Sequence, residues 1–171
     1  MTLKEVYINK EAYSIMERHA AQGAHEEIGG FLLGRPCIMD NVRVTWVMKA
    51  VPGNCISTSG HVVIESSTYD RAWNEMEQDG FIIVGWYHTH PGMGIFLSGT
   101  DVNTMSLHYQ KPYQIAIVID PINRNHGVFG WQDEYTKRLE RIRSYIFIGE
   151  DHTKYFHRRY DNRIAKLLRR K

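Results

Sequence analysis

Residues 81–101 read Phe81-Ile-Ile-Val-Gly-Trp-Tyr-His88-Thr-His90-Pro-Gly-Met-Gly-Ile-Phe-Leu-Ser98-Gly-Thr-Asp101. The apolar run at the start is typical of a strand that is buried on both faces of a sheet. If this strand continues to His88, the alternation of side chains puts His88 and His90 on the same side, where their imidazoles can converge on one point. Two imidazoles and a carboxylate such as that of Asp101 are a recurring ligand set for catalytic zinc, which leaves a fourth position for water.

Each half of this pattern also has a purely structural interpretation. A His-x-His pair at the end of a strand is often only a pair of surface residues. Ser98 followed three residues later by Asp101 forms a capping box that begins a helix, and Val102, Met105 and Tyr109 then give that helix an apolar face. The two roles are compatible, because a helix start beside a metal would hold Asp101 rigidly and point backbone N–H groups at negative charge.

The rest of the chain alternates between strand and helix patterns. Continuous or alternating apolar runs predict strands, and apolar residues at helical spacing predict helices at 10–22 and at about 67–80, the latter with Ser67 as N-cap and Gly80 as its end. The expected strands are 5–9, 27–34, 42–48, 81–87, 115–119 and 127–131. Residues 51–60 are rich in turn-forming residues and are expected to form a loop. This order predicts one α/β domain over residues 1–132, with helices on both sides of a mixed sheet.

Residues 133–171 are predicted to form a C-terminal extension that ends in a basic amphipathic helix. Residues 157–171 contain seven Lys or Arg residues and one acid, so the basic character of this chain belongs to the tail and not to the domain. The apolar residues that recur there at helical spacing are Phe156, Tyr160, Ile164 and Leu167 or Leu168. This helix is expected either to pack on the domain with its basic face in water, or to dock on a partner or an anionic surface.

Composition excludes several classes of protein. The chain has 171 residues, 43% of them hydrophobic and 23% charged, as in an ordinary soluble domain. The two cysteines, Cys37 and Cys55, are too few for a disulfide framework and indicate a reducing compartment. No apolar run approaches the ~20 residues that span a bilayer, and the sequence has neither a secretory signal nor a His-Glu-x-x-His motif. We therefore expect a cytoplasmic protein without a transmembrane segment, and nucleic acid is not an expected partner.

The motif as a whole resembles a known family signature. His88-Thr-His90-Pro, then six residues, then Ser98-x-x-Asp101 matches the JAMM (JAB/MPN+) signature of zinc metallopeptidases at every defined position. The run Glu27-Ile-Gly-Gly-Phe-Leu-Leu-Gly is similar to the glutamate-bearing strand of that family, and Ile-Val-Ile-Asp-Pro at 117–121 also looks like it. The resemblance covers roughly residues 5–132 and implies a single MPN-like domain with a mixed, curved sheet flanked by helices.

The resemblance also implies roles for individual residues. One zinc ion per chain would be held by His88, His90 and Asp101. Glu27 would carry the proton from water to the leaving amine, and Ser98 would help to stabilise the oxyanion. Glu26 is the rival for the role of Glu27, which is preferred because it stands three residues before Gly30, the spacing of the family motif.

By resemblance, the expected activity is that of a deubiquitinase-like isopeptidase. Such an enzyme hydrolyses the bond between the C-terminus of ubiquitin or a ubiquitin-like modifier and a lysine amine. The alternatives are a peptidase that trims a ubiquitin-like or sulfur-carrier precursor, and a non-catalytic MPN scaffold or binding module. The expected partner is therefore ubiquitin or a relative of it as substrate, within a larger complex or a homo-oligomer.

Overall fold

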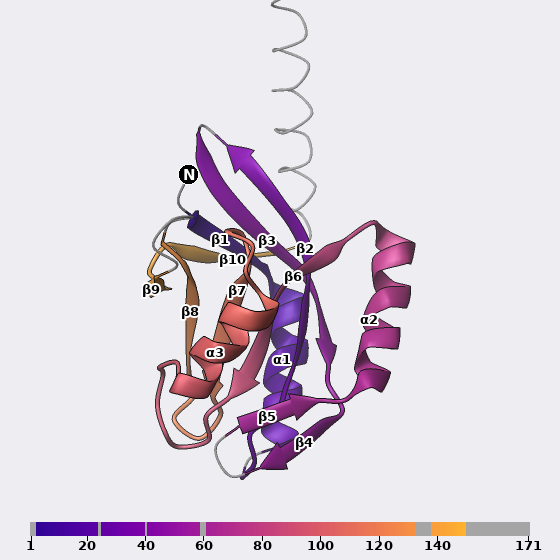
Figure 1. The fold of residues 1–171 in the computed structure, drawn as a ribbon, viewed down its shortest axis with the longest axis vertical. Coiled ribbons are helices and arrows are strands. Elements are labelled where there is room, and N and C mark those ends of the chain that lie inside the picture. Colours follow the sequence, from indigo (N-terminus) through magenta and orange to yellow (C-terminus); the bar gives the residue numbers. More distant parts are fainter. Residues whose placement is uncertain (1–2, 24, 40, 59–60, 133–137, 150–171) are drawn as a thin grey trace, which may run out of the picture.

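The computed structural model describes residues 3–23, 25–39, 41–58, 61–132 and 138–149. Its centre is one mixed sheet of eight strands in the order β10-β1-β3-β2-β6-β7-β8-β9 (Figure 1). These strands are β1 (Leu3–Asn9), β2 (Gly29–Met39), β3 (Val42–Pro52), β6 (Ile82–Thr89), β7 (Ile115–Asp120), β8 (Asn125–Trp131), β9 (Leu139–Ile142) and β10 (Tyr145–Ile148). Strand pairs β1–β10, β1–β3 and β6–β7 are parallel, whereas β2 runs antiparallel to both of its neighbours. The predicted α/β class with a mixed sheet is confirmed.

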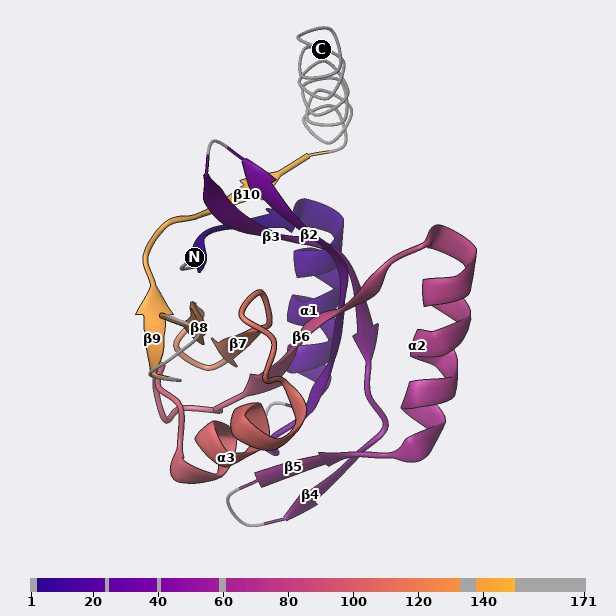
Figure 2. The ribbon, with the colours of Figure 1, turned by 45° about the horizontal axis from the view of Figure 1, so that its top comes forward.

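Helix α1 (Lys10–Gln22) lies inside the curve of the sheet. Its buried residues Ala12, Met16 and Ala20 belong to a core cluster that draws on β1, β2, β3, β6, β7, β8, β9 and β10. One helix can contact strands from both ends of a sheet only if the sheet bends around it, and Figure 2 shows this bend. The helix begins at Asn9, whose side chain accepts from the backbone N–H of Glu11, and its bounds are those predicted.

Helices α2 (Ser66–Asp79) and α3 (Gly99–His108) cover the opposite face of the sheet. Ala72 of α2 and Met105 of α3 belong to a second core cluster, together with Phe31, Trp86 and Val118 of the central strands. No described residue of α1 belongs to this cluster. The expectation of helices on both sides of the sheet is therefore confirmed.

Two local predictions are wrong. Residues 51–60 were expected to be a loop, but β3 continues to Pro52, and Cys55–Thr58 form strand β4, which pairs with β5 (His61–Ile64). Strand β4 has only four residues, and Ile56 in it is exposed to solvent. The sequence therefore has no alternation of apolar and polar residues long enough to predict this strand. Ser67 was expected to cap α2, but the N-cap is Glu65, and the Ser67 hydroxyl instead accepts from the Asn54 side chain at 3.1 Å.

Strands β9 and β10 were not predicted, and both belong to the main sheet. β9 pairs with β8 at one edge, and β10 pairs with β1 at the other, although only residues 143 and 144 separate the two strands. The expected division after residue 132 thus falls within the sheet. The predicted basic helix lies outside the described residues. In the part of the chain that the structure describes, no helix has the length and apolar character needed to cross a membrane.

Candidate metal centre

His88 lies at the C-terminal end of strand β6, and His90 is the first residue after this strand, where the alternation of side chains was expected to bring the two together. Val118 of β7 lies beside His88 on one side, and Gly29 of β2 lies beside it on the other. A Cβ atom at Gly29 would stand only 2.5 Å from the carbonyl oxygen of Tyr87. A larger residue at position 29 would therefore push β2 away from the strand that carries His88 and leads to His90.

The side chains of His88, His90 and Asp101 converge. Each offers one ligand atom, and these atoms all lie within 4.8 Å of one another. His88 Nε2 is 3.3 Å from Asp101 Oδ1, and His90 Nε2 is 3.4 Å from Asp101 Oδ2. In a tetrahedral zinc site with bonds of about 2.0–2.2 Å, neighbouring ligand atoms lie roughly 3.4 Å apart. The observed separations therefore fit a site of this kind.

Burial gives a second reason to expect an ion here. The exposed fractions of His88, His90 and Asp101 are 0%, 2% and 4%. Within the described part of the chain, both ring nitrogens of His88 and the Nδ1 atom of His90 are buried and have no hydrogen-bond partner. An unpaired buried polar group costs about 1–3 kcal/mol. A metal ion would remove part of this cost, because it would take the free lone pair of His88 Nε2.

Helix α3 holds Asp101 in place through the predicted capping box. Ser98 Oγ accepts from the Asp101 N–H at 3.1 Å, and the Ser98 N–H donates to Asp101 Oδ2 at 2.7 Å. Burial alone would raise the pKa of Asp101, but its interactions with His88, His90 and Ser98 hold this pKa well below its usual range. Asp101 is therefore an anion at neutral pH, as a metal ligand must be. The residue that closes the capping box is therefore also one of the three converging side chains.

Two aromatic residues support the histidines. The indole of Trp86 stacks on the imidazole of His88, and the ring of Phe96 packs against His90 with 4.6 Å between ring centroids. Sequence reasoning singled out neither as a support for a histidine. Trp86 reads as one residue of an apolar run, and Phe96 lies in a segment without periodicity, so no pattern in the sequence marks either contact.

The structure places Glu27 and Glu26 differently. Glu27 is half-buried and precedes β2, whereas Glu26 is exposed. Two hydrogen bonds join this part of the chain to Thr89, the residue between the two histidines. The Thr89 N–H donates to the Ile28 carbonyl at 2.8 Å, and the Ile28 N–H donates to Thr89 Oγ1 at 3.0 Å. Glu27 therefore belongs to a segment that is fixed beside His88 and His90, although it is not one of the converging ligands.

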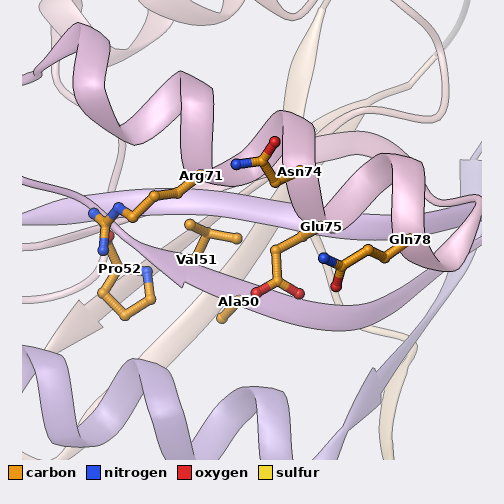
Figure 3. Close-up of a pocket in the computed structure, with 7 residues that line it drawn as sticks. All are labelled: Ala50, Val51, Pro52, Arg71, Asn74, Glu75 and Gln78. Carbon is orange, nitrogen blue, oxygen red and sulfur yellow. The ribbon is translucent and has the colours of Figure 1, made fainter.

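A cavity elsewhere in the domain has a different character. It has a volume of about 290 Å³ and lies between α2 and the end of β3. Figure 3 shows the side chains that line it. Residues such as Arg71, Glu75 and Gln78 line it, and none of the converging ligands does. His108, at the end of α3, is exposed and does not belong to the cluster either. The converging side chains therefore lie apart from both this cavity and His108.

The sequence matches a family model and a set of characterised proteins. Residues 1–114 match the model described as "JAB1/Mov34/MPN/PAD-1 ubiquitin protease". The COP9 signalosome complex subunit 5 of Drosophila melanogaster is 35% identical over 124 residues, which are 70% of this chain and 37% of that protein. The 26S proteasome regulatory subunit rpn11 of Schizosaccharomyces pombe is 35% identical over 125 residues, which are 71% of this chain and 40% of that protein. The chain thus spans well under half the length of these relatives.

The fold is also found in a solved structure. The solution structure of protein DSY2949 from Desulfitobacterium hafniense superposes with a TM-score of 0.65 over 85% of this chain and 94% of that one. The sequence identity is only 21%, so this likeness concerns the fold alone. The family model covers more than half of the chain and includes the whole His-x-His and Ser-x-x-Asp motif. The chain belongs to the JAB1/Mov34/MPN/PAD-1 family.

Proposed function

We propose that this protein is a zinc-dependent isopeptidase that cleaves the bond between the C-terminus of ubiquitin, or of a ubiquitin-like modifier, and a lysine amine. The observation that carries the proposal is the convergence of His88, His90 and Asp101 within 4.8 Å, in a buried place where ring nitrogens have no partner among the described residues. Membership of the family supports the substrate class, since its model is described as a ubiquitin protease.

In this proposal, one zinc ion would be held by His88, His90 and Asp101. Zinc of this kind supplies a Lewis acid and lowers the pKa of water to about 7. The chain supplies the remaining chemistry. Glu27 takes the proton of the attacking water and passes it to the amine that leaves, a task for a carboxylate close to the metal but not bound to it.

Ser98 is proposed to donate a hydrogen bond to the oxyanion that forms during hydrolysis. Its Oγ accepts from the Asp101 N–H, and a hydroxyl that accepts one bond can still donate its own proton. The start of α3 adds a favourable field, because the N-terminus of a helix carries partial positive charge. Ser98 would therefore serve the cap and the reaction at once.

The proposal extends to the setting of the protein. Its relatives are named as subunits of the COP9 signalosome and of the 26S proteasome, so we propose that this chain also works within a larger assembly in the cytoplasm. Full activity of the purified chain would then require a partner. A test of the proposal must therefore include a readout that does not depend on turnover.

The test measures zinc and hydrolysis together. Zinc content is determined after purification without chelators, for the natural chain and for His88→Ala, Asp101→Ala and the control His108→Ala, whose residue is exposed. We expect about one zinc per chain in the natural chain and the control, and little in the other two. Absence of zinc from the freshly purified natural chain would overturn the enzyme proposal.

Hydrolysis is then assayed on a panel of ubiquitin-like conjugates and precursors, with and without chelator. Cleavage of lysine-linked conjugates that stops on chelation supports an isopeptidase. Cleavage of precursors but not of conjugates would show that the protein is a peptidase that trims precursors and not an isopeptidase. Zinc binding without cleavage of any substrate, even in the presence of the natural assembly, would leave the binding module as the function.

A further inference from the structure

Asp120 is the last residue of β7, and its side chain is completely buried. Oδ1 accepts from the backbone N–H groups of Ile122 and Asn123, both at 3.1 Å, and Oδ2 accepts from the Asn123 side-chain Nδ2 at 2.7 Å. These bonds stay within the turn that follows β7, where an Asp residue commonly plays this part. On their own they would mark Asp120 as a turn residue.

Two further hydrogen bonds leave the turn and reach the segment that joins His90 to Ser98. The Gly92 N–H donates to Asp120 Oδ1 and the Gly94 N–H donates to Oδ2, both at 2.9 Å. Gly92 and Gly94 have φ angles of +72° and +87°, which L-residues with side chains rarely adopt. Nearby N–H groups that point into one hollow form a binding place for an anion. The segment beside the metal centre thus holds the carboxylate through two bonds of its own.

The position of this segment affects the metal ligands at both of its ends. At its start, the His90 N–H donates to the carbonyl of Ile119, the neighbour of Asp120, at 2.9 Å. Within it lies Phe96, whose ring packs against His90. At its end Ser98 begins α3 and bonds Asp101. A shift of residues 92–94 would therefore change the support of His90 and the start of the helix that carries Asp101.

Asp120 is charged in this environment. Burial alone would raise its pKa, but the hydrogen bonds from Asn123, Gly92 and Gly94 outweigh burial and hold the pKa well below its usual range. A carboxylate anion accepts stronger hydrogen bonds than a neutral group of the same shape. Replacement of the charge should therefore loosen the segment even where the volume of the side chain is kept.

We propose that Asp120 is a positioning residue of the metal centre. By accepting from the N–H groups of Gly92 and Gly94, it holds residues 91–98 in the conformation that sets His90 and Asp101 for a metal ion. It acts through this segment and not on the substrate. The consequence for metal binding rests on the proposed zinc function, whereas the effect on the segment can be measured without any metal.

Two variants disturb the contact from its two sides. Asp120→Asn keeps the size of the side chain but turns one acceptor oxygen into an NH₂ group that faces a donor. Gly94→Ala disfavours the backbone conformation at φ +87°, while its new Cβ meets no atom within 4 Å. Any defect that both share cannot be due to a clash at position 94.

Each variant has a matched control. Asn123→Ala removes the 2.7 Å bond to Asp120 inside the turn but leaves the bonds of Gly92 and Gly94, and Asn123 is exposed. Gly99→Ala also adds a methyl group to open space, but at a φ outside the left-handed region. Asn123→Ala therefore tests the loss of a bond to Asp120 inside the turn, and Gly99→Ala tests the addition of a methyl group in open space.

The first measurement uses the metal-free proteins. Amide hydrogen exchange of residues 91–98 should become faster in Asp120→Asn and Gly94→Ala and should stay unchanged in the two controls, while far-UV circular dichroism shows that all four fold. Unchanged exchange of this segment in both test variants would overturn the proposal. If Asp120→Asn fails to fold, the hydrogen exchange of residues 91–98 in Gly94→Ala alone decides whether the proposal is overturned.

The second measurement uses the metals alone. Zinc affinity, measured by competition with a chromophoric chelator, should fall about 10–100-fold in the test variants, the usual effect of losing a group that orients metal ligands. The visible spectrum of the cobalt(II) form should also change, because it reports the arrangement of the ligands. Faster exchange with unchanged affinity and spectrum would show Asp120 to be only structural. If the natural chain binds no zinc, the proposed function fails, and the exchange experiment still decides the effect of Asp120 on the segment.

Discussion

The indole N–H of Trp86 donates to the thioether sulfur of Met105 at 3.2 Å, which joins strand β6 to helix α3. The same indole ring stacks on His88, with 4.2 Å between ring centroids and 14° between ring planes. Trp86 therefore links the strand that carries His88 and leads to His90 to the helix that carries Asp101. This contact gives a first prediction about stability and metal binding.

Trp86→Phe should remove the hydrogen bond and leave a small void beside His88. Unfolding free energy should fall by about 1–3 kcal/mol, and zinc affinity should fall by about tenfold because the imidazole loses its flat support. Trp73→Phe is the matched control, since Trp73 is 60% exposed on α2. Urea unfolding and chelator competition measure the two quantities, and equal effects of the two substitutions would contradict the prediction.

Glu27→Gln tests the proposed proton carrier. The amide keeps the size of the side chain but cannot take a proton, so turnover should fall by about 10²–10⁴. Zinc content should stay the same, because the proposed ligands are His88, His90 and Asp101, and conjugated substrate should still bind. Glu26→Gln is the control and should remain active, since Glu26 is exposed. Loss of zinc from Glu27→Gln would instead make Glu27 a ligand.

The helix cap of Ser98 and its proposed role as a donor can be separated by substitution. Ser98→Ala loses the helix cap and the hydroxyl donor, so we expect a loss of about 1 kcal/mol of stability together with a 10²–10³-fold loss of kcat. Ser98→Asp keeps a good N-cap but has no hydroxyl to donate, so it should recover stability without recovering kcat. Thermal unfolding and steady-state kinetics give the two values. Recovery of kcat in Ser98→Asp would show that only the cap matters.

Two truncations distinguish the sheet from the basic tail. A chain that ends after residue 152 keeps β9 and β10 and should hydrolyse a minimal substrate within a fewfold of the full chain, with its zinc retained. A chain that ends after residue 132 loses both edge strands, together with the buried Ile142 and Ile148, and should unfold or aggregate. Circular dichroism and zinc analysis make the comparison. Stable folding of the shorter chain would make residues 133–148 dispensable for the domain.

The sequence was most informative where a pattern repeats or where chemistry restricts the residue types. Helix α1 has the predicted bounds because its buried residues recur at helical spacing. His88 and His90 meet because side chains alternate along a strand, and Ser98 forms the expected capping box with Asp101. In each case the determining interaction is local, or lies between residues that one short motif contains.

The sequence was less informative where long-range contacts decide the structure. Strand β10 has only four residues, of which Ile146 is 52% exposed, and it becomes a strand because β1 lies beside it. The hydrogen bond from the Gly92 N–H to Asp120 joins residues that are far apart in the chain. The proposed role of Glu27 came from a resemblance to a family and not from periodicity. Tertiary contacts of this kind leave no local pattern in the sequence.

The pairing of β1 with β10 has a consequence for the synthesis of the protein. β1 comes from the first residues of the domain and β10 from residues 145–148, so this contact spans almost the whole domain and can form only after nearly all of it has left the ribosome. A nascent chain would meanwhile expose an unpaired strand edge and part of the apolar surface around α1. Such contacts slow folding and favour aggregation of incomplete chains. Ribosomes stalled before residue 145 should therefore carry a chain that chaperones bind and proteases cut, and its release should allow folding to finish.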